Sequence, residues 1–73
     1  MKLIDVLNLI DNLTIITLYS RRFDPETKED EDILVAYFSK IEFKKYEKYL
    51  NALVIDACYF QNKNNVFYIL IEG

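Results

Sequence analysis

Val66-Phe-Tyr-Ile-Leu-Ile71 is the stretch that decides the fold, because it is apolar on both of its faces. A half-buried strand alternates polar and apolar residues, whereas a run without polar residues is typical of a central strand covered on both sides. Residues 54–60 (VIDACYF) also have strand composition. The Asn-rich connection at 61–65 predicts a hairpin turn between the two runs.

Two earlier runs are rich in β-branched and aromatic residues. Residues 14–20 (TIITLYS) and 32–38 (DILVAYF) are therefore predicted to be strands. The polar residues 21–31 between them include the only proline and have no apolar period, so we expect a mobile connection. Two strands joined by one loop predict an antiparallel hairpin.

The first helical pattern covers residues 2–10. Leu3, Leu7 and Ile10 fall on one stripe at helical spacing. Asn12 is the expected stop, because asparagine tolerates left-handed backbone geometry. A helix of about three turns is too short to be stable alone, so it needs a sheet to pack on.

The second helical pattern covers residues 40–52. Ser39 and Glu42 match a capping box, and Phe38 and Phe43 match the hydrophobic staple that accompanies such a box. The helix is predicted to be amphipathic, with an apolar side that packs on the sheet.

The predicted fold is a single α+β domain over residues 1–73, in the order α-β-β-α-β-β. We expect a four-stranded antiparallel sheet with two short helices on one face. Two short helices leave the other face uncovered, and the side chains expected there are Tyr19, Tyr37, Tyr59 and Tyr68. A second copy of the chain or another partner would cover that face.

Composition excludes several kinds of chemistry. The chain has no histidine, and Cys58 is its only cysteine, so histidine acid–base catalysis, Cys-His nucleophiles and His/Cys zinc sites are excluded within one chain. We expect no enzyme activity, no cofactor and no metal. Cys58 is expected to pack as a small core residue, and Asp56 is expected to face water. No secretory leader or membrane span is recognised, which predicts a cytoplasmic protein.

The net charge of −3 is distributed unevenly. Residues 24–32 hold six acidic residues and one lysine, a local charge of −5, so the remaining eight basic and six acidic residues carry +2. This acidic segment would serve as a solubilising hairpin tip or as a mimic of nucleic-acid phosphates. A calcium site is disfavoured, because the segment lacks the glycine of a calcium loop and has Lys28 inside it.

A second charged cluster suggests an alternative function. Lys44, Lys45 and Lys48 lie on the outer side of the second predicted helix and resemble a small nucleic-acid surface. A sequence pI near 4.8 argues against direct nucleic-acid binding.

The chain resembles small proteins carried by phages and mobile elements of Gram-positive bacteria. The similarity lies in the opening Met-Lys-Leu-Ile-Asp-Val-Leu-Asn-Leu-Ile-Asp, in the Ile/Thr-rich strand after it, and in the closing Phe-Tyr-Ile-Leu-Ile-Glu. The acidic segment departs from that pattern. The resemblance implies a short helix followed by short strands, and it raises inhibitors of host defence, including anti-CRISPR proteins, as a functional class.

We therefore expect a non-enzymatic binding protein that occludes a basic groove on a host protein or protein–nucleic-acid complex. The acidic residues that would steer it are Asp24, Glu26, Glu29, Asp30, Glu31 and Asp32, and the four tyrosines would supply contact area. A structural homodimer whose sheets pack face to face is the alternative from another class.

Overall fold

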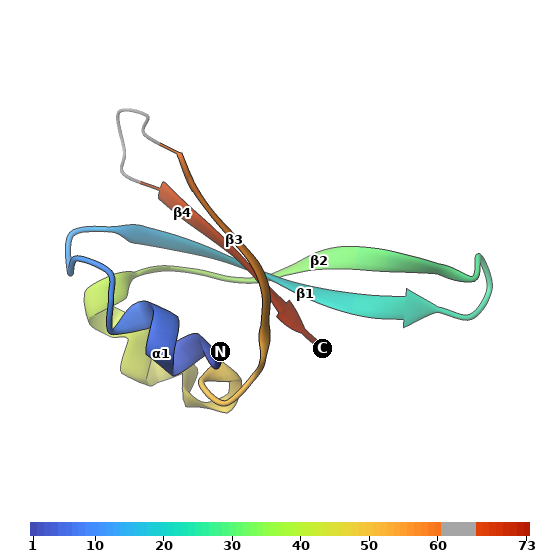
Figure 1. Ribbon diagram of the computed structural model, residues 1–73, viewed down its shortest axis with the longest axis horizontal. Coiled ribbons are helices and arrows are strands. Elements are labelled where there is room, and N and C mark those ends of the chain that lie inside the picture. The colour runs from blue at the N-terminus through green and yellow to red at the C-terminus, as the bar shows by residue number, and fades with distance from the viewer. Residues whose placement is uncertain (61–65) are drawn as a thin grey trace.

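The computed structural model describes residues 1–60 and 66–73, with residues 59 and 60 described through their backbone alone. The elements follow one another in the predicted order. They are α1 (Leu3–Leu7), β1 (Ile15–Asp24), β2 (Glu29–Ser39), the 3-10 helix η1 (Lys40–Tyr49), β3 (Val54–Phe60) and β4 (Val66–Glu72). Both helices lie on the same side of the sheet (Figure 1).

The four strands form one mixed sheet in the order β2-β1-β4-β3. β1 pairs antiparallel with β2 and β3 pairs antiparallel with β4, so both predicted strand pairs are confirmed. The central strands β1 and β4 run parallel, and the prediction of a fully antiparallel sheet is therefore wrong. The position of β4 as a central strand is confirmed. The turn predicted at 61–65 lies outside the described residues.

The route of the chain between the two strand pairs explains the parallel centre. Ser39 at the end of β2 pairs with Ile15, whereas Val54 at the start of β3 pairs with Ile71. Because β1 and β4 are parallel, these two points lie at opposite ends of the sheet. The ten residues of η1 rise by about 2 Å each, so they span roughly the length of six strand residues. The helix thus carries the chain back along the sheet before β3 begins.

The core lies between the helices and the inner face of the sheet. Leu3 and Leu7 of α1 are fully buried, which confirms the predicted stripe, and Ile10 packs partly buried against the same cluster. The strands contribute Ile16, Leu18, Ala36, Phe38, Ile69 and Ile71. Burial of this cluster is the main stabilising contribution in so small a domain.

The first helix is shorter than predicted, since it ends at Leu7. Asn12 was expected to adopt a left-handed backbone, but among the described non-glycine residues only Lys28 has a positive φ. The turn after α1 is shaped by Asp11, whose Oδ1 accepts the N–H of Leu13 at 2.9 Å. This hydrogen bond to the backbone two residues later shapes the connection to β1, whereas the helix itself ends earlier, with Asn8 as its C-cap.

The second helix exists where predicted, but it is a 3-10 helix and not an α-helix. Ser39 is its N-cap residue, yet the Ser39 side chain makes no capping hydrogen bond. Tyr46 departs from helical geometry at φ −117° and ψ 35°, and its ring stacks on Phe38 at 4.3 Å between centroids. Phe43, the predicted staple partner of Phe38, packs against the same core. Packing of bulky aromatic side chains thus overrides the helical preference of this segment.

The mobile connection predicted at residues 21–31 is wrong, because β1 and β2 continue through most of it. Arg21 stands opposite Asp32, and Arg22 stands opposite Glu31. Opposite charges paired across two strands stabilise a ladder that has no apolar face. We call residues 21–32 the acidic arm, and Figure 1 shows that it projects away from the helices and from the other two strands.

A tight turn at residues 25–28 closes the acidic arm. The Asp24 carbonyl accepts the N–H of Lys28 at 2.8 Å, and Asp24 Oδ1 accepts the N–H of Glu26 at 2.9 Å. Lys28 has φ 58°, the left-handed geometry that such a turn needs at its last position. The acidic segment is thus a built hairpin tip.

Candidate protein-binding surface

The sheet face opposite the helices, which we call the open face, carries three rows of side chains. On β1, Thr17, Tyr19 and Arg21 belong to this face, because side chains alternate along a strand and Ile16 and Leu18 point into the core; Thr17 is nevertheless buried. Strand pairing extends each row across the sheet. The rows are Cys58, Tyr68, Thr17 and Tyr37; then Asp56, Leu70, Tyr19 and Leu34; then Glu72, Arg21 and Asp32.

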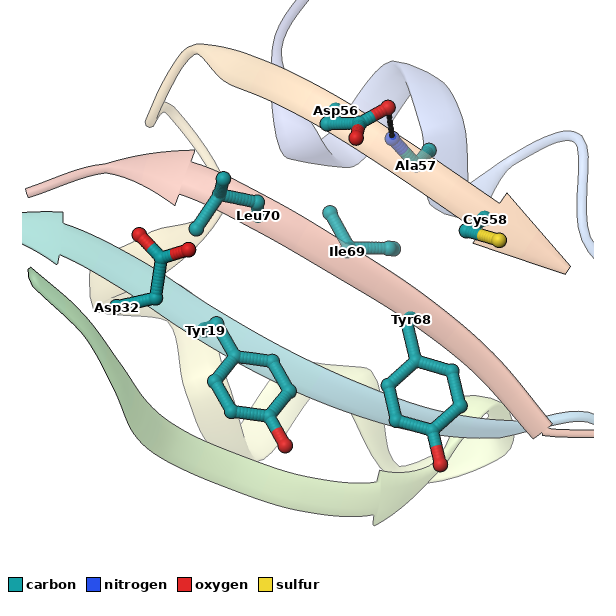
Figure 2. A pocket seen from close by; sticks show the side chains of 8 residues that line it. All are labelled: Tyr19, Asp32, Asp56, Ala57, Cys58, Tyr68, Ile69 and Leu70. Carbon is teal, nitrogen blue, oxygen red and sulfur yellow. Dashed lines mark hydrogen bonds between the residues drawn. The ribbon is translucent and has the colours of Figure 1, made fainter.

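A groove of about 370 Å³ lies on this face. Its floor includes Leu70 of β4. The rings of Tyr19 and Tyr68 form one side, with centroids 6.4 Å apart and planes inclined by 18°. Asp56 and Cys58 of β3 form the other side (Figure 2). The groove therefore has an aromatic wall and a polar wall with an aliphatic floor between them.

One end of the groove holds an ion pair. Arg21 Nε donates to Asp32 Oδ1 at 3.0 Å, and Nη2 lies 3.4 Å from Oδ2. The hydrogen bond that Arg21 donates to Asp32 raises the pKa of Arg21; desolvation opposes this rise, and the charges of Asp32, Asp30 and Asp56 add to it. The two rows at this end of the open face hold three carboxylates, Asp32, Asp56 and Glu72, and one guanidinium, that of Arg21. The local charge is therefore negative.

The predicted tyrosines divide into two groups. Tyr19, Tyr37 and Tyr68 lie on the open face, as expected from the sequence. Tyr37 is 61% exposed, whereas Tyr19 and Tyr68 are half-buried against the groove. The side chain of Tyr59 lies outside the described residues. The role of these tyrosines in binding stays a prediction.

The predicted acidic residues all lie on the acidic arm: Asp24, Glu26, Glu29, Asp30, Glu31 and Asp32. Asp32 is the member that also lines the groove. It therefore connects the charged arm to the aromatic wall. This continuity was not visible in the sequence, where residues 21–31 were interpreted as a loop.

Cys58 and Asp56 were assigned opposite surroundings, and one assignment is wrong. Asp56 is exposed, as expected, and its Oδ1 accepts the N–H of Ala57 at 2.9 Å. Cys58 was expected in the core, but its thiol is free and exposed. Residues two apart on a strand share a face, so a solvated Asp56 already indicated a solvated Cys58. Leu70 and Leu34 also lie on the open face, and the sequence alone does not indicate this, because their place beside Tyr19 depends on which strands pair.

The lysines of the alternative hypothesis lie on a different side of the molecule. Lys44, Lys45 and Lys48 are exposed on η1, across the sheet from the open face. Lys45 pairs with Glu42 at 3.2 Å, and the Lys48 ammonium lies 5.0 Å from the centroid of the Tyr49 ring. They therefore do not join the open-face tyrosines in one surface.

No family model, curated protein or solved structure matches the chain. Within residues 1–60 and 66–73, no helix is long and apolar enough to cross a membrane. Among these same residues, no three cysteine or acidic side chains gather closely enough to hold a metal ion.

Proposed function

We propose that this protein is a non-enzymatic binding protein that occludes a basic, nucleic-acid-binding groove on a host protein or protein–nucleic-acid complex. The observation that carries the proposal is the continuity of the acidic arm with the open face through Asp32. A negative projection joined to exposed tyrosines offers both electrostatic steering and contact area to one partner. The sequence resemblance to phage and mobile-element proteins supports a bacterial host as the source of that partner.

The geometry of the acidic arm suits a groove that accommodates nucleic acid. Glu29, Asp30, Glu31 and Asp32 are consecutive residues of β2. Successive side chains of a strand point to opposite faces, so Asp30 and Asp32 share one face, Glu29 and Glu31 share the other, and carboxylates on one face are about 6.8 Å apart. Regularly spaced carboxylates along both faces of the strand present negative charge to the arginine and lysine side chains that would otherwise bind a phosphate backbone.

The open face would supply the part of the contact that is not electrostatic. Tyr37 and Leu34 are 61% and 54% exposed; Leu34 stands beside the half-buried Tyr19, and Tyr37 lies in the neighbouring row beside Thr17. Tyrosine buries a large apolar area, loses little conformational entropy and keeps a hydroxyl for hydrogen bonding, so it is enriched at the centre of interfaces. The acidic arm would therefore govern the association rate, and the open face would govern the lifetime of the complex.

The proposal is tested with two double variants of equal charge change. Glu29→Gln/Glu31→Gln neutralises two carboxylates of the acidic arm, and Glu42→Gln/Glu47→Gln neutralises two exposed carboxylates of η1. Each variant and the wild type would be used to capture partners from bacterial lysate at rising salt concentration, with identification by mass spectrometry.

We expect the wild type to retain a nucleic-acid-binding protein and to compete with nucleic acid for it. The arm variant should bind at least threefold more weakly and with a flatter salt dependence, and the η1 variant should bind like the wild type. Equal capture by both variants, or a partner that keeps its nucleic acid when bound, would contradict the proposal.

A further inference from the structure

We propose that the groove on the open face holds an arginine side chain of the partner, with its guanidinium between the Tyr19 and Tyr68 rings and the Asp56 carboxylate. This inference rests on the proposed function and names the chemistry that the open face recognises. It is carried by the arrangement of an aromatic wall, an aliphatic floor and an acidic wall within one groove of about 370 Å³.

The shape of the groove is set by one row of side chains across three strands. Leu70 stands between Asp56 on β3 and Tyr19 on β1 in the same row of the sheet. Neighbouring strands lie about 4.8 Å apart, so the two walls are separated by roughly 10 Å at the backbone. An arginine would lay its methylene stem on Leu70, as long basic side chains do on apolar surfaces.

The aromatic wall consists of two neighbouring tyrosine rings. The rings of Tyr19 and Tyr68 lie side by side, at 6.4 Å between centroids and with an angle of 18° between their planes (Figure 2). Figure 2 looks onto the open face and shows both rings nearly face-on, so together they offer a broad π surface to a flat cation that lies over them at the mouth of the groove. Guanidinium groups stack on such surfaces and are attracted by the ring quadrupole.

The polar wall of the groove carries the carboxylate of Asp56. Oδ1 of Asp56 accepts the N–H of Ala57, and the second carboxylate oxygen lies on the side of the groove (Figure 2). Asp32, at the end of the groove, already binds the guanidinium of Arg21. The chain thus pairs one of its own arginines with a carboxylate on this face, and Asp56 offers the same chemistry to an incoming one.

Charge selects arginine over other occupants. Three carboxylates against one guanidinium repel a phosphate, so a stacked nucleotide is disfavoured although the rings would suit a base. An apolar side chain would desolvate Asp56 without a partner. A lysine would pair with Asp56 but has no flat face for the two rings.

The test uses the full chain labelled with ¹⁵N and three capped pentapeptides of sequence Gly-Gly-X-Gly-Gly. X is arginine, lysine or citrulline, the last being a neutral isostere of arginine. One positive charge per peptide limits non-specific attraction to the acidic arm. Backbone amide shifts are followed during each titration, with oligouridylate as a further probe.

We expect the arginine peptide to shift the amides of Tyr19, Cys58, Tyr68 and Leu70, and to bind at least threefold more tightly than the lysine peptide. Citrulline should produce no saturable shift. Shifts confined to the acidic arm, equal binding of arginine and lysine, or stronger binding of oligouridylate would overturn the inference. Shifts of the same amides with protein concentration alone would also overturn it, because they would assign the groove to a second copy of the chain.

Two variants with matched controls locate the site. Asp56→Asn keeps an oxygen that can accept the Ala57 N–H but removes the charge, and Glu47→Gln removes an exposed charge on η1. We expect Asp56→Asn to raise the dissociation constant of the arginine peptide about three- to tenfold and Glu47→Gln to leave it unchanged. Equal dissociation constants for the two variants would overturn the assignment of Asp56.

Tyr68→Leu tests the aromatic wall in the same titration and should reduce the preference for arginine over lysine. An undiminished preference in a folded Tyr68→Leu chain would overturn the stacking step. The wild-type peptide titrations keep the proposal testable even if this variant unfolds. Failure at the groove would leave the effect of Glu29→Gln/Glu31→Gln on partner capture intact, so the failure of this inference and that of the proposed function are distinguishable.

Discussion

The two halves of the β1–β2 hairpin are paired by the same backbone ladder but held by different forces. In the inner half, Leu18 and Ile16 are fully buried against the helices. In the outer half, Phe23 is 63% exposed, and arginines face carboxylates across the strands. The difference shows that a strand here requires a paired neighbour but not a buried face.

This contrast separates what specifies the fold from what is free to serve binding. The inner half supplies the core that a 73-residue chain depends on for stability. The acidic arm buries little and concentrates charge, so substitutions there should alter binding far more than folding.

Leu18→Ala should have the largest effect on stability. The Leu18 side chain is 0% exposed at the centre of the sheet, so truncation leaves a cavity that the neighbouring side chains fill only in part. We expect a loss of about 2–5 kcal/mol in the free energy of unfolding, measured by urea denaturation followed by circular dichroism. Complete unfolding of the variant would agree with the prediction, because a loss of this size is a large fraction of the total stability of a small domain.

Phe23→Ala is the matched control on the same strand, because it removes a larger side chain from the acidic arm. We expect it to change the free energy of unfolding by less than about 1 kcal/mol. A loss equal to that of Leu18→Ala would mean that the outer half of the hairpin contributes to the core after all.

The contrast also explains which parts of the fold the sequence predicts. The four apolar runs are predicted as strands, and their ends near the core are nearly correct. Buried strands have an apolar composition that can be recognised in the sequence. The last residues of β1 and the first residues of β2 are not predicted as strand, since Arg21 and Asp32 stabilise each other only once the two strands are paired. The parallel centre is missed for a similar reason: the sequence pattern of a strand does not encode the identity of its neighbour.

The candidate site divides in the same way. Four tyrosines were expected on the face that the two helices leave uncovered, and Tyr19, Tyr37 and Tyr68 lie there, while the side chain of Tyr59 is outside the described residues. The groove between Tyr19 and Asp56 depends on the order of β1, β4 and β3, which arises from the helical crossover. The prediction that Cys58 packs in the core is wrong, because Cys58 lies two residues from the solvated Asp56 and shares its face.

Lys28→Gly should stabilise the chain by about 0.5–1 kcal/mol. Lys28 adopts φ 58°, a geometry that costs a residue with a Cβ atom about 1 kcal/mol and costs glycine little. Part of this gain is offset by the larger conformational entropy of glycine in the unfolded chain. Urea denaturation would measure the change, and Lys28→Asn is the control that removes the same charge with a smaller relief of strain. A destabilised Lys28→Gly chain would contradict the tight turn at the tip of the arm.

Arg21→Gln should have the smallest effect and one that does not depend on pH near neutrality. Pairing with Asp32 raises the pKa of Arg21, so its stabilising contribution is fully present below the ordinary arginine range and is lost only as the pH rises through the raised value. We expect the melting temperature to fall by no more than about 2 °C, and by the same amount at pH 6 and pH 9. Arg22→Gln removes an equal charge from the neighbouring residue and serves as the control. If the difference in melting temperature between Arg21→Gln and Arg22→Gln changed between pH 6 and pH 9, Arg21 would be acting through another titrating group. That result would contradict the assignment of Arg21 to a simple ion pair with Asp32.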